Sequence, residues 1–121
     1  MPAAVRQTSE WMAVEPLDRI ARAAHAMYRT ARVRAADVDV ACLHADASAL
    51  VPLAVRAYGV ARARVNPHGG QLCEAALDGV NDVAEAVRQL RGDAANRVRG
   101  ARLALVAGSL LEPTSAVLLA S

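Results

Sequence analysis

Two nearly continuous apolar segments in the last part of the chain constrain the fold most strongly. Residues 101–107 and 115–120 contain mainly Ala, Val and Leu, and a connection over 108–114 separates them. A strand that is covered on both faces has such a continuous apolar sequence, whereas a half-exposed strand alternates apolar and polar residues. These segments therefore predict two strands inside a layered domain, with helices packed on the sheet.

Three other segments have the spacing of amphipathic helices. The first spans residues 16–31 and begins at Pro16, a residue favoured in a first helical turn. The second is expected to start near Asp46 or Ser48, either of which can cap it, and to end before Gly59. The apolar positions of the first helix are Leu17, Ile20, Ala21, Ala24, Met27, Tyr28 and Ala31.

The third amphipathic segment follows residue 79 and ends at Gly92. Asp78 and Asp82 stand at its start, and Arg88 and Arg91 stand near its end, an arrangement that suits the helix dipole. An amphipathic helix normally buries its apolar stripe. The stripe of this helix comprises Val80, Val83, Ala84, Val87 and Leu90.

Two short strands are expected between these helices. Residues 37–43 alternate in the manner of a strand that leads inward, and residues 60–65 are short enough for a second one. The predicted order is α-β-α-β-α-β-β, which indicates an α/β domain with a mixed sheet. We expect one domain over 16–121, preceded by a flexible or docking leader over 1–15.

The composition indicates a core of small side chains. Apolar residues make up 55% of the 121 residues, but aromatic residues make up only 2% and Phe is absent. The core must therefore be built from Ala, Val and Leu. An apolar excess of this kind suggests that the chain buries part of its surface against a partner.

The charges and cysteines exclude several function classes. All 14 basic residues are Arg, the net charge is only +2, and no aromatic residues alternate with the arginines to stack bases. Nucleic-acid binding is therefore not expected.

Neither a signal peptide nor a membrane span is expected, and a cytoplasmic location is the default. Cys42 and Cys73 have neither the spacing of metal ligands nor that of a disulfide framework, so no metal site is expected.

The segment from Asn66 to Gly79 has the features of an active-site loop. Gly69-Gly70 indicates a backbone that turns with positive φ or lies close to another group. His68 precedes this pair and has the only type of side chain with an ordinary pKa near neutrality. The loop leads directly into the third helix.

This loop and the segments around it resemble the C-terminal domain of the thiolase superfamily, in particular the sterol-carrier-type thiolases and the steroid side-chain aldolases. Asn66-Pro67-His68-Gly69-Gly70 is similar to the family's Asn-x-x-Gly-Gly loop. The resemblance covers residues 16–121 and implies a single thiolase-like half domain. Further similar segments are Leu17-Asp18-Arg19-Ile20, Glu74-Ala75, Gly79, Asn81, residues 85–92 and residues 101–120.

The departures from that family concern its catalytic residues. The nucleophilic cysteine of a thiolase belongs to the other half of the protein, and the family's second cysteine has no counterpart in residues 101–121. The histidine of the Gly-His-Pro motif falls among Ala75, Ala76 and Leu77, and the aldolases' tyrosine falls at Ala76. A methyl group can neither attack nor transfer a proton, so independent thiolase or aldolase activity is not expected.

Two side chains of the loop remain as catalytic candidates. His68 either donates to a thioester oxygen in an oxyanion hole or holds the Gly-Gly turn by a backbone hydrogen bond. Cys73 is either a relocated nucleophile or, as we favour, a buried inert thiol. The expected binding loop comprises Asn66, Gly69, Gly70, Glu74 and Gly79.

The other polar candidates are assigned structural roles. Glu74 and Asp78 form either a carboxylate pair or, more commonly, groups that cap or solvate a helix start. His25 and His44 are expected to be structural or solvent-facing. Cys42, in an apolar strand, is expected in the core.

Two functions follow from the resemblance. The favoured one is a non-catalytic or half-site subunit that completes or scaffolds a complex that processes acyl-CoA of lipid, steroid or polyketide type. The alternative is an acyltransferase or retro-aldol lyase that uses His68, with or without Cys73, in a composite site. A pocket that only binds an acyl ligand is a third possibility.

Expected partners are a thiolase N-terminal half, an acyl-CoA enzyme, a second copy, or a small OB-fold protein. No cofactor is expected beyond acyl-CoA thioester as a ligand.

Overall fold

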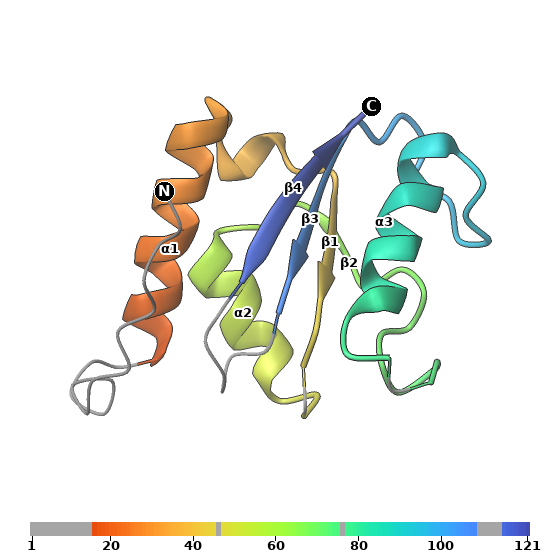
Figure 1. Ribbon diagram of the computed structural model, residues 1–121, viewed down its shortest axis with the longest axis horizontal. Coiled ribbons are helices and arrows are strands. Elements are labelled where there is room, and N and C mark those ends of the chain that lie inside the picture. Colours follow the sequence, from red (N-terminus) through yellow and green to blue (C-terminus); the bar gives the residue numbers. More distant parts are fainter. Residues whose placement is uncertain (1–15, 46, 76, 109–114) are drawn as a thin grey trace.

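The chain folds into three layers, with a central sheet between two helical layers (Figure 1). The computed structural model describes residues 16–45, 47–75, 77–108 and 115–121. Helices α1 (Pro16–Ala31) and α2 (Leu50–Tyr58) cover one face of the sheet, and α3 (Val80–Arg91) covers the other. The predicted leader, residue 46, residue 76 and most of the connection over 108–114 lie outside the described residues.

The sheet has four strands in the order β2-β1-β3-β4. β1 (Val40–Leu43) runs parallel to β2 (Arg64–Val65) and to β3 (Leu103–Ala107), whereas β4 (Ala116–Ala120) is antiparallel to β3. In the register of the sheet, Ala41 of β1 pairs with Leu105 of β3, and Leu105 pairs with Leu118 of β4. The predicted α/β class, mixed sheet and order of elements are confirmed.

The two faces of β1 and β3 are both buried, as the continuous apolar sequence predicted for β3. Ala41 and Leu43 pack in the core under α1 and α2, and Val40 and Cys42 pack in the core under α3. The Asp39 carboxylate accepts hydrogen bonds from the backbone N–H groups of Arg102 (2.8 Å) and Leu103 (3.1 Å), which joins the start of β1 to β3. The small side chains let the helices lie close to the sheet.

Several predicted boundaries are wrong by a few residues. The first strand begins at Val40 because Ala35–Asp37 forms a 3-10 turn, in which Asp37 accepts a hydrogen bond from the backbone N–H of Arg34 (2.8 Å). The second helix begins at Leu50 after Ala49, and no side chain caps it, so Ser48 is not its cap. Both α2 and α3 end at the predicted glycines, Gly59 and Gly92.

The prediction that the last strand is covered on both faces is also wrong. The residues of β4 are exposed or only half-buried. β4 is an edge strand that pairs with β3 alone among the described strands, so its side chains have fewer neighbours than those of β3. A continuous apolar sequence does not distinguish this edge position from a central one.

Helix α3 is oriented differently from the prediction. Val80 and Val83, two members of its apolar stripe, are exposed, and the positions that it buries are mostly polar. Two of these polar groups, Asp82 and Gln89, have hydrogen-bonding partners in the loops at the two ends of the helix, which the sequence periodicity does not reveal. The buried residues of α3 are Asn81, Asp82, Glu85, Ala86 and Gln89.

Within the core under α1 and α2, a hydrogen bond joins the two helices. The Tyr28 hydroxyl donates a hydrogen bond to the backbone carbonyl oxygen of Tyr58 (2.9 Å). The Tyr58 hydroxyl is also buried but bonds to no described residue. Burial raises the pKa of both hydroxyl groups to about 12, so each is protonated at neutral pH.

We expect Tyr28→Phe to lower the free energy of unfolding by about 0.5–1.5 kcal/mol, because it removes a buried hydrogen bond. Tyr58→Phe is the matched control, since it removes a hydroxyl that bonds to no described residue and should cost less or be neutral. Urea denaturation followed by circular dichroism measures both. Equal losses in the two variants would contradict the assigned hydrogen bond.

Candidate functional site

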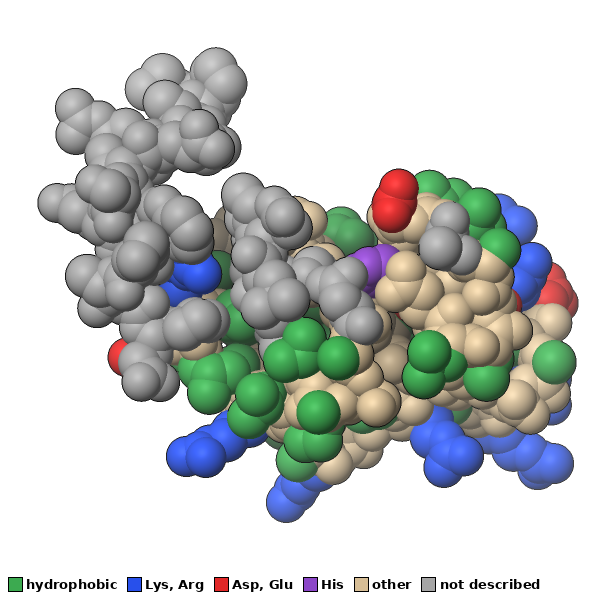
Figure 2. All heavy atoms as spheres, turned by 90° about the horizontal axis from the view of Figure 1, so that it is seen from below, with side chains coloured by type: hydrophobic (Ala, Val, Ile, Leu, Met, Phe, Trp, Pro, Cys, Tyr) green, Lys and Arg blue, Asp and Glu red, His purple; other side chains and the backbone are tan. Residues whose placement is uncertain are grey.

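The candidate site lies where the carboxyl ends of β1 and β2 meet the first turn of α3. His44 directly follows β1, the loop with His68 follows β2, and Asp82 lies in the first turn of α3. Ligands of open α/β sheets commonly bind at the carboxyl ends of parallel strands. Figure 2 looks onto this end of the sheet and shows histidine atoms at the surface, with hydrophobic side chains on either side.

Asn66 fixes the start of the loop on β1. Its side-chain oxygen accepts a hydrogen bond from the Leu43 N–H (2.7 Å), and its amide nitrogen donates to the Leu43 carbonyl (3.1 Å). Its own backbone N–H donates to the Ala41 carbonyl (2.9 Å), and its φ of 43° turns the chain out of the sheet. Asn tolerates this left-handed conformation better than most residues. The Asn66 side chain therefore has a structural role, because both of its polar groups hold the start of the loop against the end of β1.

The Gly-Gly pair meets both of the backbone requirements predicted for it. Gly69 and Gly70 have φ values of 92° and 68°. A Cβ atom on Gly69 would lie 2.5 Å from the Cys73 sulfur, closer than side-chain atoms approach each other. The pair therefore lets the chain fold back on itself and brings Cys73 beside Gly69, the residue that follows His68.

His68 is paired with a buried carboxylate. Its Nε2 atom lies 3.1 Å from Oδ1 of Asp82, and the other oxygen of Asp82 lies 3.5 Å from Nδ1 of His44. The side chains of His68 and Asp82 are almost fully buried, although the backbone of His68 is partly exposed. A carboxylate hydrogen-bonded to one ring nitrogen fixes the orientation of an imidazole, as in catalytic His–Asp pairs.

Two buried polar groups beside this pair lack a described partner. The Nδ1 atom of His68 and both polar side-chain atoms of Asn81 form no hydrogen bond with a described residue. Asn81 precedes Asp82 on α3 and is only 6% exposed. A buried polar group without a partner costs about 1–3 kcal/mol. Each such group in a folded protein therefore requires an explanation, and a catalytic role is one of those known.

A hollow of about 520 Å³ opens beside the loop. The Asn96 side chain, from the loop after α3, closes part of it and donates a hydrogen bond to the Pro67 carbonyl (3.0 Å). His68 and Cys73 both line this hollow. The full lining consists of Ala63, Arg64, Val65, Asn66, Pro67, His68, Gly69, Cys73 and Asn96.

The two cysteines differ from each other in exposure. Cys42 is buried in the core, as predicted, and burial together with the charges of Asp82, Glu85 and Glu74 raises its pKa to about 12. Cys73 is exposed, so the prediction of a buried thiol is wrong. The sharp turn at Gly69-Gly70 leaves its side chain at the rim of the hollow instead of in the core.

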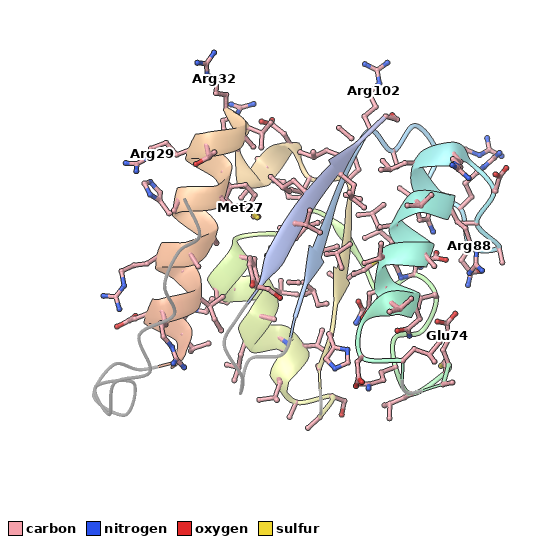
Figure 3. All side chains as sticks on the ribbon, viewed as in Figure 1. Met27, Arg29, Arg32, Glu74, Arg88 and Arg102 are labelled. Carbon is pink, nitrogen blue, oxygen red and sulfur yellow. The ribbon has the colours of Figure 1, made fainter. Side chains whose placement is uncertain are left out.

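The remaining loop residues lie away from the His68–Asp82 pair. Gly79, with a φ of 88°, is the N-cap of α3, and no side chain caps this helix, so neither Glu74 nor Asp78 is its cap. Glu74 is half-buried, and Figure 3 shows it on the side of α3 that is farther from the sheet. Asp78 is exposed. Among the described residues, neither of these carboxylates forms an ion pair with a basic side chain. The position of Ala76 lies outside the described residues.

The described residues also bear on metal binding and on membrane insertion. Among them, no group of three or more His, Cys, Asp or Glu side chains is arranged to hold a metal ion. No helix in this part of the chain has the length and apolar character needed to cross a membrane. His25 is exposed on α1, as predicted.

The structure adds four residues that the sequence did not identify: His44, Asn81, Asp82 and Asn96. The sequence predicts that Asp82 complements the helix dipole and that His44 is structural or solvent-facing. The available signal was positional, because residues that follow two parallel strands meet at one edge of the sheet. This signal can be used only once β1 and β2 are known to be neighbouring strands, and the sequence does not show that they are.

The chain is similar to steroid side-chain-cleaving aldolases. It is 48% identical to the 17-hydroxy-3-oxo-4-pregnene-20-carboxyl-CoA lyase of Mycobacterium tuberculosis over 58 residues, which is 48% of this chain and 15% of the lyase. It is 44% identical to the steroid side-chain-cleaving aldolase of Thermomonospora curvata over 54 residues, 45% of this chain and 14% of that protein. No protein-family model matches the chain.

The fold is that of a solved aldolase. The Ltp2-ChsH2(DUF35) aldolase superposes with a TM-score of 0.79 and 27% sequence identity, over 84% of this chain and 31% of that chain. The similarity therefore extends over most of the described domain. The chain spans only a small part of the length of each curated relative that it matches.

We expect a thiol reagent such as DTNB, at about pH 8, to modify Cys73 rapidly in the folded chain and to leave Cys42 unmodified. Cys42 should react only after denaturation, because it is inaccessible and its raised pKa leaves almost no thiolate. Cys73→Ser is the control and should abolish the reaction of the folded chain. Two thiols that react at the same rate in the folded chain would show that Cys42 is not buried.

Proposed function

We propose that this chain is a thiolase-like C-terminal domain of the steroid-aldolase type that completes or scaffolds an acyl-CoA-processing complex. The similarity to a pregnene-carboxyl-CoA lyase and to a steroid side-chain-cleaving aldolase supports this class and favours a steroid or related lipid thioester. The match covers only 31% of the Ltp2-ChsH2(DUF35) aldolase chain, so more than two thirds of that chain has no counterpart here. A second protein unit would supply the groups that correspond to the remainder.

The observation that carries this proposal is an apolar strip at the start of α3, which we define as Leu72, Leu77, Val80 and Val83. These side chains are 86%, 52%, 67% and 41% exposed. Val80 and Val83 are three residues apart and so lie on one side of the helix. Large apolar side chains exposed together are typical of a surface that a partner covers.

The position of the strip connects assembly with the site. Leu72 directly precedes Cys73 at the rim of the hollow, and Val83 directly follows Asp82. The polar side of α3 holds His68 through Asp82, while the valines face outward. A partner seated on the strip would therefore lie against the hollow and restrict the access of water to it.

The described residues around the hollow favour a subunit over an independent enzyme. Only His68 and Cys73 among the lining residues have side chains suited to proton transfer or nucleophilic attack near neutral pH. The resemblance places the aldolases' tyrosine at Ala76. Each missing general acid or base typically costs about 10²–10⁴-fold in rate.

A composite enzyme is the second candidate function. The His68–Asp82 pair favours it, because an imidazole oriented by a carboxylate is suited to proton transfer or to stabilising an oxyanion. In that case a partner would supply the nucleophile or the second acid. Candidate partners are a thiolase N-terminal half, an acyl-CoA enzyme, a second copy of the chain, and a small OB-fold protein.

We expect the double variant Val80→Asp and Val83→Asp to weaken assembly at least about tenfold, since it places charges in an apolar contact. Light scattering of the purified chain, alone and with a candidate partner, measures the effect. Leu53→Asp on α2 is the matched control, because Leu53 is 39% exposed and lies on the opposite layer. A stable monomer that turns over an acyl-CoA unaided would contradict the proposal.

For the composite enzyme, we expect His68→Gln to lower kcat of the active complex by about 10²–10⁴-fold. Asp82→Asn should lower kcat less and alter its pH dependence, because it leaves the imidazole in place but removes the carboxylate that orients it. His25→Gln, on the exposed side of α1, is the control. Unchanged turnover in His68→Gln would leave His68 a structural residue.

A further inference from the structure

The segment around the end of α3 concentrates positive charge. Five of the chain's arginines lie between residues 88 and 102, together with a single acidic residue that follows α3, Asp93. All five side chains are exposed, and Figure 3 shows Arg88 and Arg102 pointing away from the domain. The five are Arg88, Arg91, Arg97, Arg99 and Arg102.

Three of these arginines surround a hollow of about 250 Å³, which we call the arginine hollow. Arg91 belongs to the last turn of α3, and Arg97 and Arg99 belong to the loop over residues 92–100. Guanidinium groups present several N–H donors that match the oxygens of phosphate groups. The complete lining consists of Gln89, Leu90, Arg91, Gly92, Arg97, Val98, Arg99, Gly100 and Ala101.

A buried side chain holds this loop in place. The Gln89 amide nitrogen donates to the Asn96 carbonyl (3.0 Å), and its oxygen accepts a hydrogen bond from the Val98 N–H (2.8 Å). Gln89 is only 2% exposed, and it also bonds to the Glu85 carboxylate (2.7 Å). The backbone that carries Arg97 and Arg99 is therefore fixed before a ligand arrives, which lowers the entropic cost of binding.

The charges of the arginines are not neutralised within the described part of the chain. None of the five forms an ion pair with another described residue. Arg97 donates one long hydrogen bond to the Gly92 carbonyl (3.4 Å), which offsets the negative end of the helix dipole. Its remaining donors, and those of Arg91 and Arg99, are available to an anion.

The arginine hollow and the hollow beside His68 share one loop. Asn96 lines the hollow beside His68 and bonds to the Pro67 carbonyl, while its neighbour Arg97 lines the arginine hollow. A ligand with phosphate groups at one end and a thioester at the other could contact both. Coenzyme A thioesters have that chemistry.

We propose that Arg91, Arg97 and Arg99 bind the phosphate groups at the nucleotide end of a coenzyme A thioester, whose acyl end lies toward His68. This assignment deepens the proposed function, because it depends on an acyl-CoA as the ligand. It does not depend on the apolar strip or on assembly.

Calorimetric titration of the full chain with acetyl-CoA and with S-acetylpantetheine, which lacks the phosphates, tests the assignment. Acetyl-CoA should bind more tightly, and the double variant Arg97→Gln and Arg99→Gln should weaken its binding at least about tenfold. The same variant should leave the binding of S-acetylpantetheine unchanged. Arg22→Gln with Arg29→Gln, on α1, is the matched control and should bind acetyl-CoA normally.

Three outcomes would overturn the assignment. The first is equal affinity of the wild-type chain for acetyl-CoA and S-acetylpantetheine, and the second is an unchanged affinity in the Arg97 and Arg99 variant. The third is an equal loss in the Arg22 and Arg29 control, which would indicate only the overall charge. Failure of the strip variants to change assembly would count against the proposed subunit role while leaving these titrations interpretable.

Discussion

The requirement that buried polar groups be hydrogen-bonded determines how α3 sits in this protein. The helix turns Asp82, Glu85 and Gln89 inward, and each end of this polar face meets a loop. At the start, Asp82 contacts His68 from the loop after β2. Near the end, Gln89 bonds to the backbone of the loop that follows the helix. One helix face therefore positions both loops of the candidate site.

The same orientation explains the surface of the molecule. Because polar side chains occupy the buried side of α3, the valines of its expected apolar stripe are left partly or largely exposed. Val80 and Val83 form the apolar strip together with Leu72 and Leu77 of the preceding loop, and Leu72 directly precedes Cys73 at the rim of the hollow that His68 lines. In the proposed function, partner binding and ligand binding are therefore neighbouring properties of this one helix, an arrangement that suits a domain within a larger assembly.

The order of elements and the turns could be predicted from the sequence because they depend on local chemistry. Pro16 at a helix start, the glycines that end α2 and α3, and the Gly-Gly turn at residues 69–70 all appear where expected. The predictions that failed concern burial. Whether the last strand is central or at an edge depends on neighbours that are distant in sequence. Whether Cys73 is inside or outside depends on how the turn at Gly69-Gly70 directs the loop relative to the rest of the domain.

The sequence by itself determined the α/β class, the sequence of helices and strands, and the loop from Asn66 to Gly79 with His68 in it, since periodicity and backbone preference act over a few residues. Only the tertiary structure decided that Asp82 pairs with His68, that Gln89 fixes the arginine-bearing loop, and that α3 exposes its valines. The physical reason is that a helix with one apolar and one polar side has two ways to face a sheet. Hydrogen-bonding partners from other segments, and not the apolar pattern of the helix, select between them.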